Sequence, residues 1–139
     1  MAECRLIRGG ESFRGTQGLD YFAGVSAETT GATGICMHIV DLPPGASAVP
    51  HYHEAHETAI LLLEGTVEMR HGLDLDQLMR MEAGDFIYIP AGVPHQPYNP
   101  TDRPARGVLA RTDPNEQESV VLIDQTVVSE RWAVLGSNQ

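Results

Sequence analysis

Cysteine and positive charge are both scarce in this sequence. Cys4 and Cys36 are its two cysteines, too few for a disulfide framework, so we expect a reducing compartment and place the protein in the cytoplasm. Nine basic residues stand against 19 acidic ones, and the formal net charge is −10. Because this charge would repel a phosphate backbone, nucleic acid is not an expected partner.

Long apolar runs are missing too. The longest one extends from Ala59 to Leu63, far short of the roughly 20 residues that span a bilayer, so no membrane partner is expected. The N-terminal stretch MAECRLIRGGE holds no apolar signal core. A length of 139 residues fits one domain, which we expect to extend over 1–139.

Helical periodicity is weak, whereas turn residues are frequent. The 14 glycines and nine prolines separate short runs rich in valine, isoleucine, leucine and aromatic residues, a pattern typical of a closed all-β domain. One of the breaks, Glu64-Gly65, suits a tight hairpin. The strands predicted in this way are 35–42, 58–64, 66–71, 77–82, 85–90, 95–99, 105–112 and 118–124.

The two ends of the chain differ from its middle. Residues 1–33 are rich in glycine, serine and threonine, and we interpret them as an arm that packs on a neighbouring subunit. The core of the domain then extends over about 34–124. Near the C-terminus, Trp132 is interpreted as a packing anchor.

Three of the six histidines crowd into the segment HYHEAHE, as His51, His53 and His56. Residues i and i+2 of a strand point to the same side, so His51 and His53 are expected to face one way together. Neutral imidazoles side by side can hold a metal ion through their free nitrogens. Taken alone, an H-x-H pair would also fit a polar surface loop.

A second segment, 84–99, reads GDFIYIPAGVPHQPYN. Pro90 and Gly92 are expected to turn the chain sharply after a strand, which places His95 at the start of the next strand. A rigid turn that leads into a single histidine is a suitable way to bring a ligand from a distant part of the chain to the H-x-H pair.

Together these segments resemble the two sequence motifs of the cupin superfamily. The first, G-x5-H-x-H-x(3,4)-E-x6-G, is matched up to its last spacing by Gly45, His51, His53, Glu57 and Gly65; the second, G-x5-P-x-G-x2-H-x3-N, is matched throughout by Gly84, Pro90, Gly92, His95 and Asn99. The resemblance covers 45–112. It implies a jelly-roll barrel (a double-stranded β-helix), one divalent metal ion per chain, and a homodimer formed through exchanged terminal strands.

One spacing departs from the first motif, since seven residues instead of six separate Glu57 from Gly65. The extra residue implies a β-bulge, which re-aims the side chains beside it. If the bulge follows Glu57, the metal site is His51, His53, Glu57 and His95. If it precedes His56, the site is His51, His53, His56 and His95, similar to zinc-bearing cupins that act as polyketide cyclases, and Glu57 is a catalytic base or a supporting group.

The resemblance implies a metalloenzyme that acts on a small, oxygen-rich molecule, most concretely a zinc-dependent polyketide cyclase. The alternatives are an Fe(II) or Mn(II) dioxygenase of the quercetinase-like type and a metal-dependent binding module without catalysis. Zinc is the expected ion, with iron, manganese and nickel as alternatives. Ile60, Leu62, Tyr88 and Met37 are predicted to contact the substrate. Arg106 and Arg111 either orient an anionic substrate or pair with acidic groups on the surface.

Overall fold

The computed structural model describes residues 3–116 and 120–123. Nearly all of its regular structure is β-strand. Its elements are β1 (Ser12–Arg14), β2 (Asp20–Val25), α1 (Ala27–Thr30), β3 (Cys36–Leu42), β4 (His51–His53), β5 (Thr58–Glu64), β6 (Thr66–His71), β7 (Gln77–Glu82), β8 (Phe86–Ile89), β9 (His95–Tyr98), β10 (Ala105–Arg111) and β11 (Val120–Leu122). Within the described ranges, no helix has the length and apolar character needed to cross a membrane.

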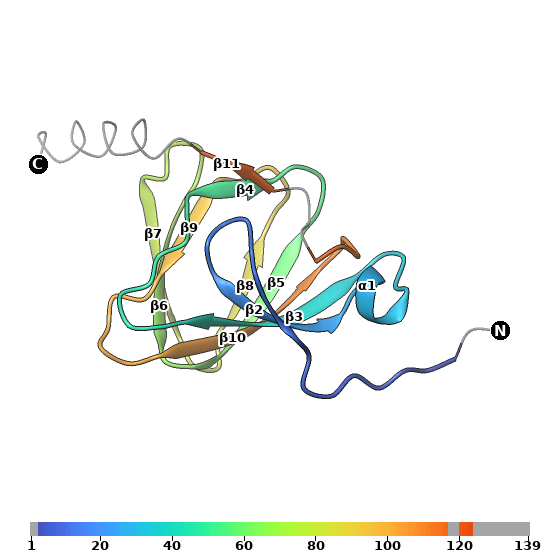
Figure 1. Cartoon of the computed structure of the whole chain (residues 1–139). Coiled ribbons are helices and arrows are strands. Elements are labelled where there is room, and N and C mark those ends of the chain that lie inside the picture. Colours follow the sequence, from blue (N-terminus) through green and yellow to red (C-terminus); the bar gives the residue numbers. More distant parts are fainter. Residues whose placement is uncertain (1–2, 117–119, 124–139) are drawn as a thin grey trace, which may run out of the picture.

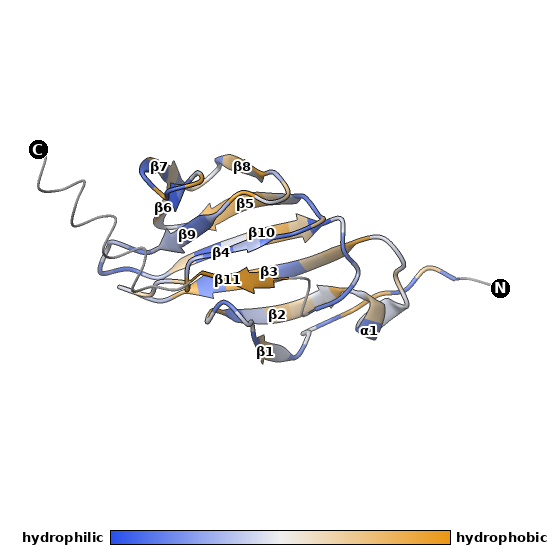
Figure 2. Ribbon diagram, turned by 90° about the horizontal axis from the view of Figure 1, so that it is seen from above, coloured by the Kyte–Doolittle hydropathy of each residue, from blue (hydrophilic) through white to orange (hydrophobic). Residues whose placement is uncertain are grey.

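Two antiparallel sheets face each other and form a jelly-roll barrel (Figure 1). The larger sheet has the strand order β1-β2-β3-β10-β5-β8, which Figure 2 shows side by side, and the smaller one has the order β11-β4-β9-β6-β7. Side chains that point inward from both sheets form one core. Its buried members are Leu19, Tyr21, Val40, Leu42, Ala48, Leu62, Val67, Met69, Met81, Ile87, Ile89, Ala105 and Leu109.

The N-terminal quarter of the chain differs from its predicted form. Residues 1–33 were interpreted as an arm, but β1 pairs with β2, and β2 pairs with β3 of the same chain. Leu19 and Tyr21 belong to the core. Residues 12–14 and 20–25 are therefore part of the larger sheet, because the apolar residues of β2 alternate and bury one face. The homodimer and its exchanged strands stay predictions, and Trp132 lies outside the described residues.

At Gly65 the chain passes from one sheet to the other, so this residue does not form the predicted hairpin. The strands on either side of it, β5 and β6, belong to different sheets. The residue has a φ of 84°, in the left-handed region that glycine adopts without a steric penalty. A Cβ atom there would lie 2.7 Å from the carbonyl oxygen of Pro104. Both the turn and the close approach of the neighbouring strand thus require glycine.

Asn99, the last residue of the second motif, is a structural residue. Its side chain is buried, with 1% of its surface exposed. Its Nδ2 donates to the carbonyl oxygens of Leu42 (3.0 Å) and Arg103 (2.6 Å), while its Oδ1 accepts from the backbone N–H (2.9 Å) and the hydroxyl (2.7 Å) of Thr101. The amide therefore fixes the turn between β9 and β10 against the end of β3.

We expect Asn99→Ala to lower the free energy of unfolding by about 2–4 kcal/mol, because it leaves several buried backbone groups without a partner. Urea unfolding followed by circular dichroism measures this loss, and the m-value should stay unchanged. A loss below about 1 kcal/mol would show that water replaces the amide without cost.

Candidate metal centre

Three histidines from two neighbouring strands meet inside one end of the barrel. His51 and His53 are the first and last residues of β4, and His95 is the first residue of β9. The two strands pair antiparallel with His51 directly opposite His95. The alternation along β4 turns both of its histidines inward, and all three side chains are buried.

The three imidazoles are close enough to share one ion. One ring nitrogen from each of His51, His53 and His95 lies within 4.8 Å of the other two. The ring centroids are 4.3 Å apart for His51 and His95, and 5.3 Å apart for the other two pairs. Two nitrogens that bind one zinc at about 2.0–2.1 Å each lie no more than about 4 Å apart. Small side-chain adjustments would bring the three rings to that spacing.

Backbone carbonyls fix the orientation of two of these rings. His51 Nδ1 donates to the Val49 carbonyl oxygen at 2.6 Å, and His95 Nδ1 donates to the Val93 carbonyl oxygen at 2.9 Å. Each bond places the proton on Nδ1 and leaves the Nε2 lone pair free for a metal. Metal-binding histidines in proteins are commonly oriented by this kind of bond.

All three imidazoles are neutral at pH 7. Burial, followed by the charge of His95, lowers the pKa of His51 to about 3. Burial and, to a smaller extent, the Arg111 guanidinium lower the pKa of His95 to about 4; the Val93 hydrogen bond raises it, by an amount that lies between these two effects. The pKa of His53 is lowered by the same two causes. Neutral imidazoles are the form that binds metal, so the cluster needs no deprotonation at physiological pH.

His56 lies beside this cluster but outside the group of three. Its side chain is buried, and its ring centroid is 4.7 Å from that of His53. Its Nδ1 is 3.4 Å from Asp113 Oδ2, which orients the ring. Burial lowers its pKa, and Asp113 raises it by less. Of the two alternatives for the fourth ligand, His56 is the one on the inner side of the barrel.

Glu57 faces the other way, which corrects its predicted role as a ligand or base. Its carboxylate is exposed and accepts a hydrogen bond of 2.6 Å from the Tyr88 hydroxyl. The chain bends between β4 and β5, so the alternation starts afresh at Thr58, which points inward. The predicted bulge does follow Glu57, but it lies at Leu63, the residue skipped in the pairing of β5 with β10.

The four predicted substrate contacts divide between the two faces of the larger sheet. Ile60 and Leu62 line the cavity next to the histidines. Met37 and Tyr88 lie on the outer face, with 47% and 60% of their surfaces exposed. Because β3 and β8 carry apolar residues on both faces, hydrophobicity did not identify the inner one, and a substrate contact of these two residues stays a prediction.

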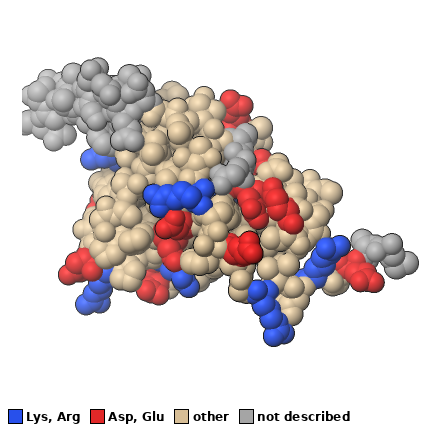
Figure 3. Space-filling view, viewed as in Figure 1, with Lys and Arg blue, Asp and Glu red and all other residues tan. Residues whose placement is uncertain are grey.

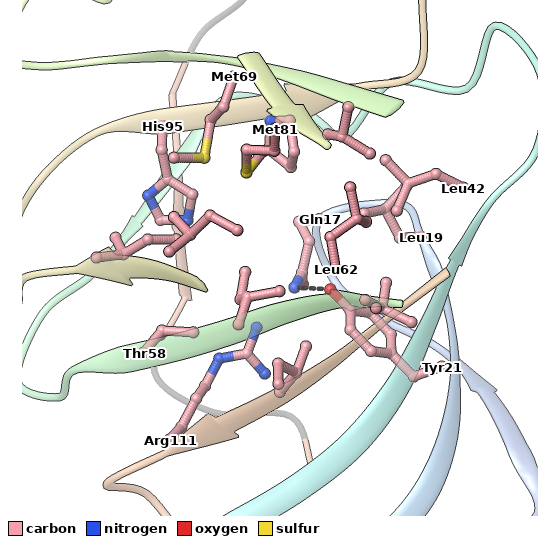
Figure 4. A pocket seen from close by; sticks show the side chains of 18 of the residues that line it. Gln17, Leu19, Tyr21, Leu42, Thr58, Leu62, Met69, Met81, His95 and Arg111 are labelled. Atoms are coloured by element: carbon pink, nitrogen blue, oxygen red, sulfur yellow. Dashed lines mark hydrogen bonds between the residues drawn. The ribbon is translucent and has the colours of Figure 1, made fainter. Parts of the chain in front are cut away.

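The cavity has a volume of about 50 Å³ and a mostly apolar wall. Both sheets contribute side chains to it (Figure 4). Its polar lining residues are Gln17, Tyr21, His51, Thr58, His95 and Arg111. A water molecule needs roughly 10–15 Å³ of such space, so the cavity has room for a few waters or a ligand of similar size.

Sequence reasoning missed several residues at this site. Gln17 and Tyr21 come from the segment interpreted as an arm, yet both line the cavity. For Arg111 the sequence left open a role in orienting an anionic substrate and a place on the surface; the residue is 6% exposed. His71 lies directly opposite His95 in the pairing of β6 with β9. The alternation of ARGVLAR, with Ala105, Gly107 and Leu109 turned inward, was the signal that would have placed Arg111 inside.

A family model described as a cupin domain matches residues 38–110, more than half of the chain. This chain belongs to the cupin family. No curated protein matches it. Among solved structures, a point mutant of Bacillus subtilis oxalate decarboxylase is similar, with 20% identity and a TM-score of 0.69 over 84% of this chain and 30% of that chain. The cupin thus spans about 30% of the length of that relative.

Two further structures are similar to this cupin. One is an oxalate decarboxylase from Bacillus subtilis described with Mn(II) centres (20% identity, TM-score 0.67, covering 80% of this chain and 29% of that chain). The other is an uncharacterized protein with a double-stranded β-helix domain from Klebsiella pneumoniae (17% identity, TM-score 0.63, covering 85% and 89%). At these identities the similarity shows the fold alone.

The second motif of the cupin also supports the first one physically. Gly92 has a φ of 77° and donates its N–H to the His53 carbonyl oxygen at 2.7 Å. The turn before β9 is thereby bound to β4, so the two segments that carry the histidines hold each other in place.

On the face shown in Figure 3, the basic side chains stand singly among acidic ones.

Proposed function

We propose that this cupin binds one divalent metal ion through His51, His53 and His95 and is a metalloenzyme for a small, oxygen-bearing substrate. The observation that carries the proposal is the group of three buried imidazole nitrogens within 4.8 Å of one another. Three protein ligands that leave further positions open are typical of catalytic metal sites, whereas structural sites are closed by four.

The residues present fit such an ion. His51 and His95 offer Nε2 lone pairs, because their Nδ1 atoms donate to backbone carbonyls. A bound divalent ion would supply Lewis-acid chemistry, in which a substrate oxygen is polarised. His56, held by Asp113, lies beside His53 and is suited to be a fourth ligand or to carry a proton at the edge of the site. The apolar wall around them excludes bulk water and strengthens electrostatic interactions inside.

The size of the cavity bears on the substrate. A volume of about 50 Å³ is well below the 300–1,000 Å³ or so of sites for drug-sized ligands. A poly-β-keto chain does not fit such a space, so the cavity favours a substrate of few atoms over the cyclase version of the function.

Elemental analysis of the protein purified without added metal tests this proposal. We expect about one divalent ion per chain, or uptake of one equivalent when metal is added. Zinc would support Lewis-acid chemistry on small carbonyl compounds. Iron or manganese would favour the dioxygenase, which oxygen uptake under turnover would confirm and full anaerobic activity would exclude. A protein that neither holds nor takes up metal would refute the proposal.

A further inference from the structure

A guanidinium lies inside the barrel close to the histidines. Arg111 is the last residue of β10, and its side chain points into the cavity (Figure 4). Of the described residues that line the cavity, it is the only one charged at neutral pH, and no carboxylate is among them. Its charge contributes to the lowered pKa of His51, His53, His56 and His95. Arg111 therefore brings a positive charge to the wall of the cavity.

Thr58 supplies a second, independent indication of a ligand. It lies directly opposite Arg111 in the pairing of β5 with β10, so both side chains point into the cavity. The residue is 2% exposed, and its Oγ1 has no hydrogen-bond partner within the part of the chain that the structure describes. A buried hydroxyl without a partner is costly, and a ligand oxygen would satisfy it.

Two further side chains hold the guanidinium in place. The Arg111 Cζ atom lies 5.9 Å from the centre of the Tyr21 ring, a cation–π distance. The Tyr21 hydroxyl accepts a hydrogen bond from Gln17 Nε2, which orients the ring (Figure 4). Arginine donors held rigidly in a planar fork match the two oxygens of a carboxylate.

We infer that Arg111 and Thr58 form a binding site for the carboxylate of a small acid. The inference rests on the proposed function in one respect, namely that a second oxygen of the same ligand reaches the metal. The ligand class is thus a short carboxylic acid with a neighbouring oxygen, such as a 2-oxo or 2-hydroxy acid. Its carboxylate carries the negative charge that a guanidinium and a divalent ion both attract.

Titration calorimetry with pyruvate and with its neutral isostere pyruvamide tests the inference, on metal-loaded and on chelator-treated protein. We expect metal-loaded wild type to bind pyruvate at least about 10-fold more tightly than pyruvamide, the usual range for hydrogen bonds to a charged group. Arg111→Gln should abolish this preference, and Thr58→Val should weaken pyruvate binding by roughly 3- to 10-fold. Arg106→Gln is the matched control, because Arg106 lies on the same strand but pairs with Asp41 on the outer face.

The metal content of each variant separates the two proposals. If wild type holds metal but binds pyruvate and pyruvamide equally, or if Arg111→Gln keeps the preference, the carboxylate site is refuted and the metal site stands. If no metal binds but an Arg111-dependent preference for pyruvate persists in the apoprotein, the metal site is refuted and the carboxylate site stands. Should Arg111→Gln fail to fold, unchanged pyruvate affinity in both Arg111→Lys and Thr58→Val would overturn the inference.

Discussion

The variant His53→Gln should hold no more than about one tenth of the metal that the wild-type chain holds. Loss of even a supporting group of a metal site weakens binding by roughly 10- to 100-fold, and loss of a ligand costs at least as much. His53 Nδ1 and Nε2 are buried among the other histidines, so no water or neighbouring carboxylate easily takes their place. Inductively coupled plasma mass spectrometry after dialysis against trace metal measures the occupancy.

Glu57→Gln is the control, since it removes the carboxylate that the first motif offers as a ligand. Glu57 faces outward and accepts a hydrogen bond from Tyr88, so the metal content of Glu57→Gln should equal that of wild type. The metal content of His56→Gln should lie between those of His53→Gln and Glu57→Gln, because His56 is next to His53 but outside the group of three. Full metal content in His53→Gln, or its loss in Glu57→Gln, would show that the structure assigns the wrong ligands.

Much of the fold was accessible from sequence because turn residues delimit the strands. The predicted strands 58–64, 66–71 and 77–82 coincide with β5, β6 and β7. Gly65 and Gly72 lie between these runs, so chain breaks and strand ends agree. By contrast, β1 and β2 were missed. The segments beside them are rich in glycine, and the alternation of buried Leu19, Tyr21 and Ala23 with Asp20 and Gly24 is only a weak signal of a strand.

The faces of the strands were harder to predict than their positions. In β3, Cys36, His38 and Val40 point inward while Met37 and Ile39 point outward, and apolar residues occupy both sets. Composition cannot distinguish such faces, because the distinction depends on which side the second sheet covers. Glu57 was misplaced for a related reason: the bend before Thr58 breaks the alternation that links it to His53.

The metal-free protein should lose stability as the pH falls from about 6.5 towards 4. In the unfolded chain a histidine titrates near 6.5, whereas in the folded protein the pKa of His38 is lowered to about 4, first by burial and then by Arg111. The pKa values of His51 and His95 are lowered in the same direction. Between these values the unfolded state binds more protons than the folded state, so acid favours unfolding. Each such histidine contributes up to about 1.4 kcal/mol per pH unit.

Urea unfolding between pH 8 and pH 4 in the presence of a chelator measures this dependence. Above pH 7 the free energy of unfolding should be nearly flat. His38→Gln isolates one contribution away from the three-histidine group, because glutamine can accept from the Gly24 N–H as His38 Nδ1 does at 3.1 Å but cannot take up a proton. Below pH 6.5 the free energy of unfolding of His38→Gln should therefore fall less steeply with pH than that of wild type, and the difference is the contribution of one histidine. Equal slopes would mean that His38 finds a partner for its proton in the folded state. In metal-loaded protein the ligands cannot be protonated until the ion leaves, so metal release and loss of stability should occur together at a lower pH.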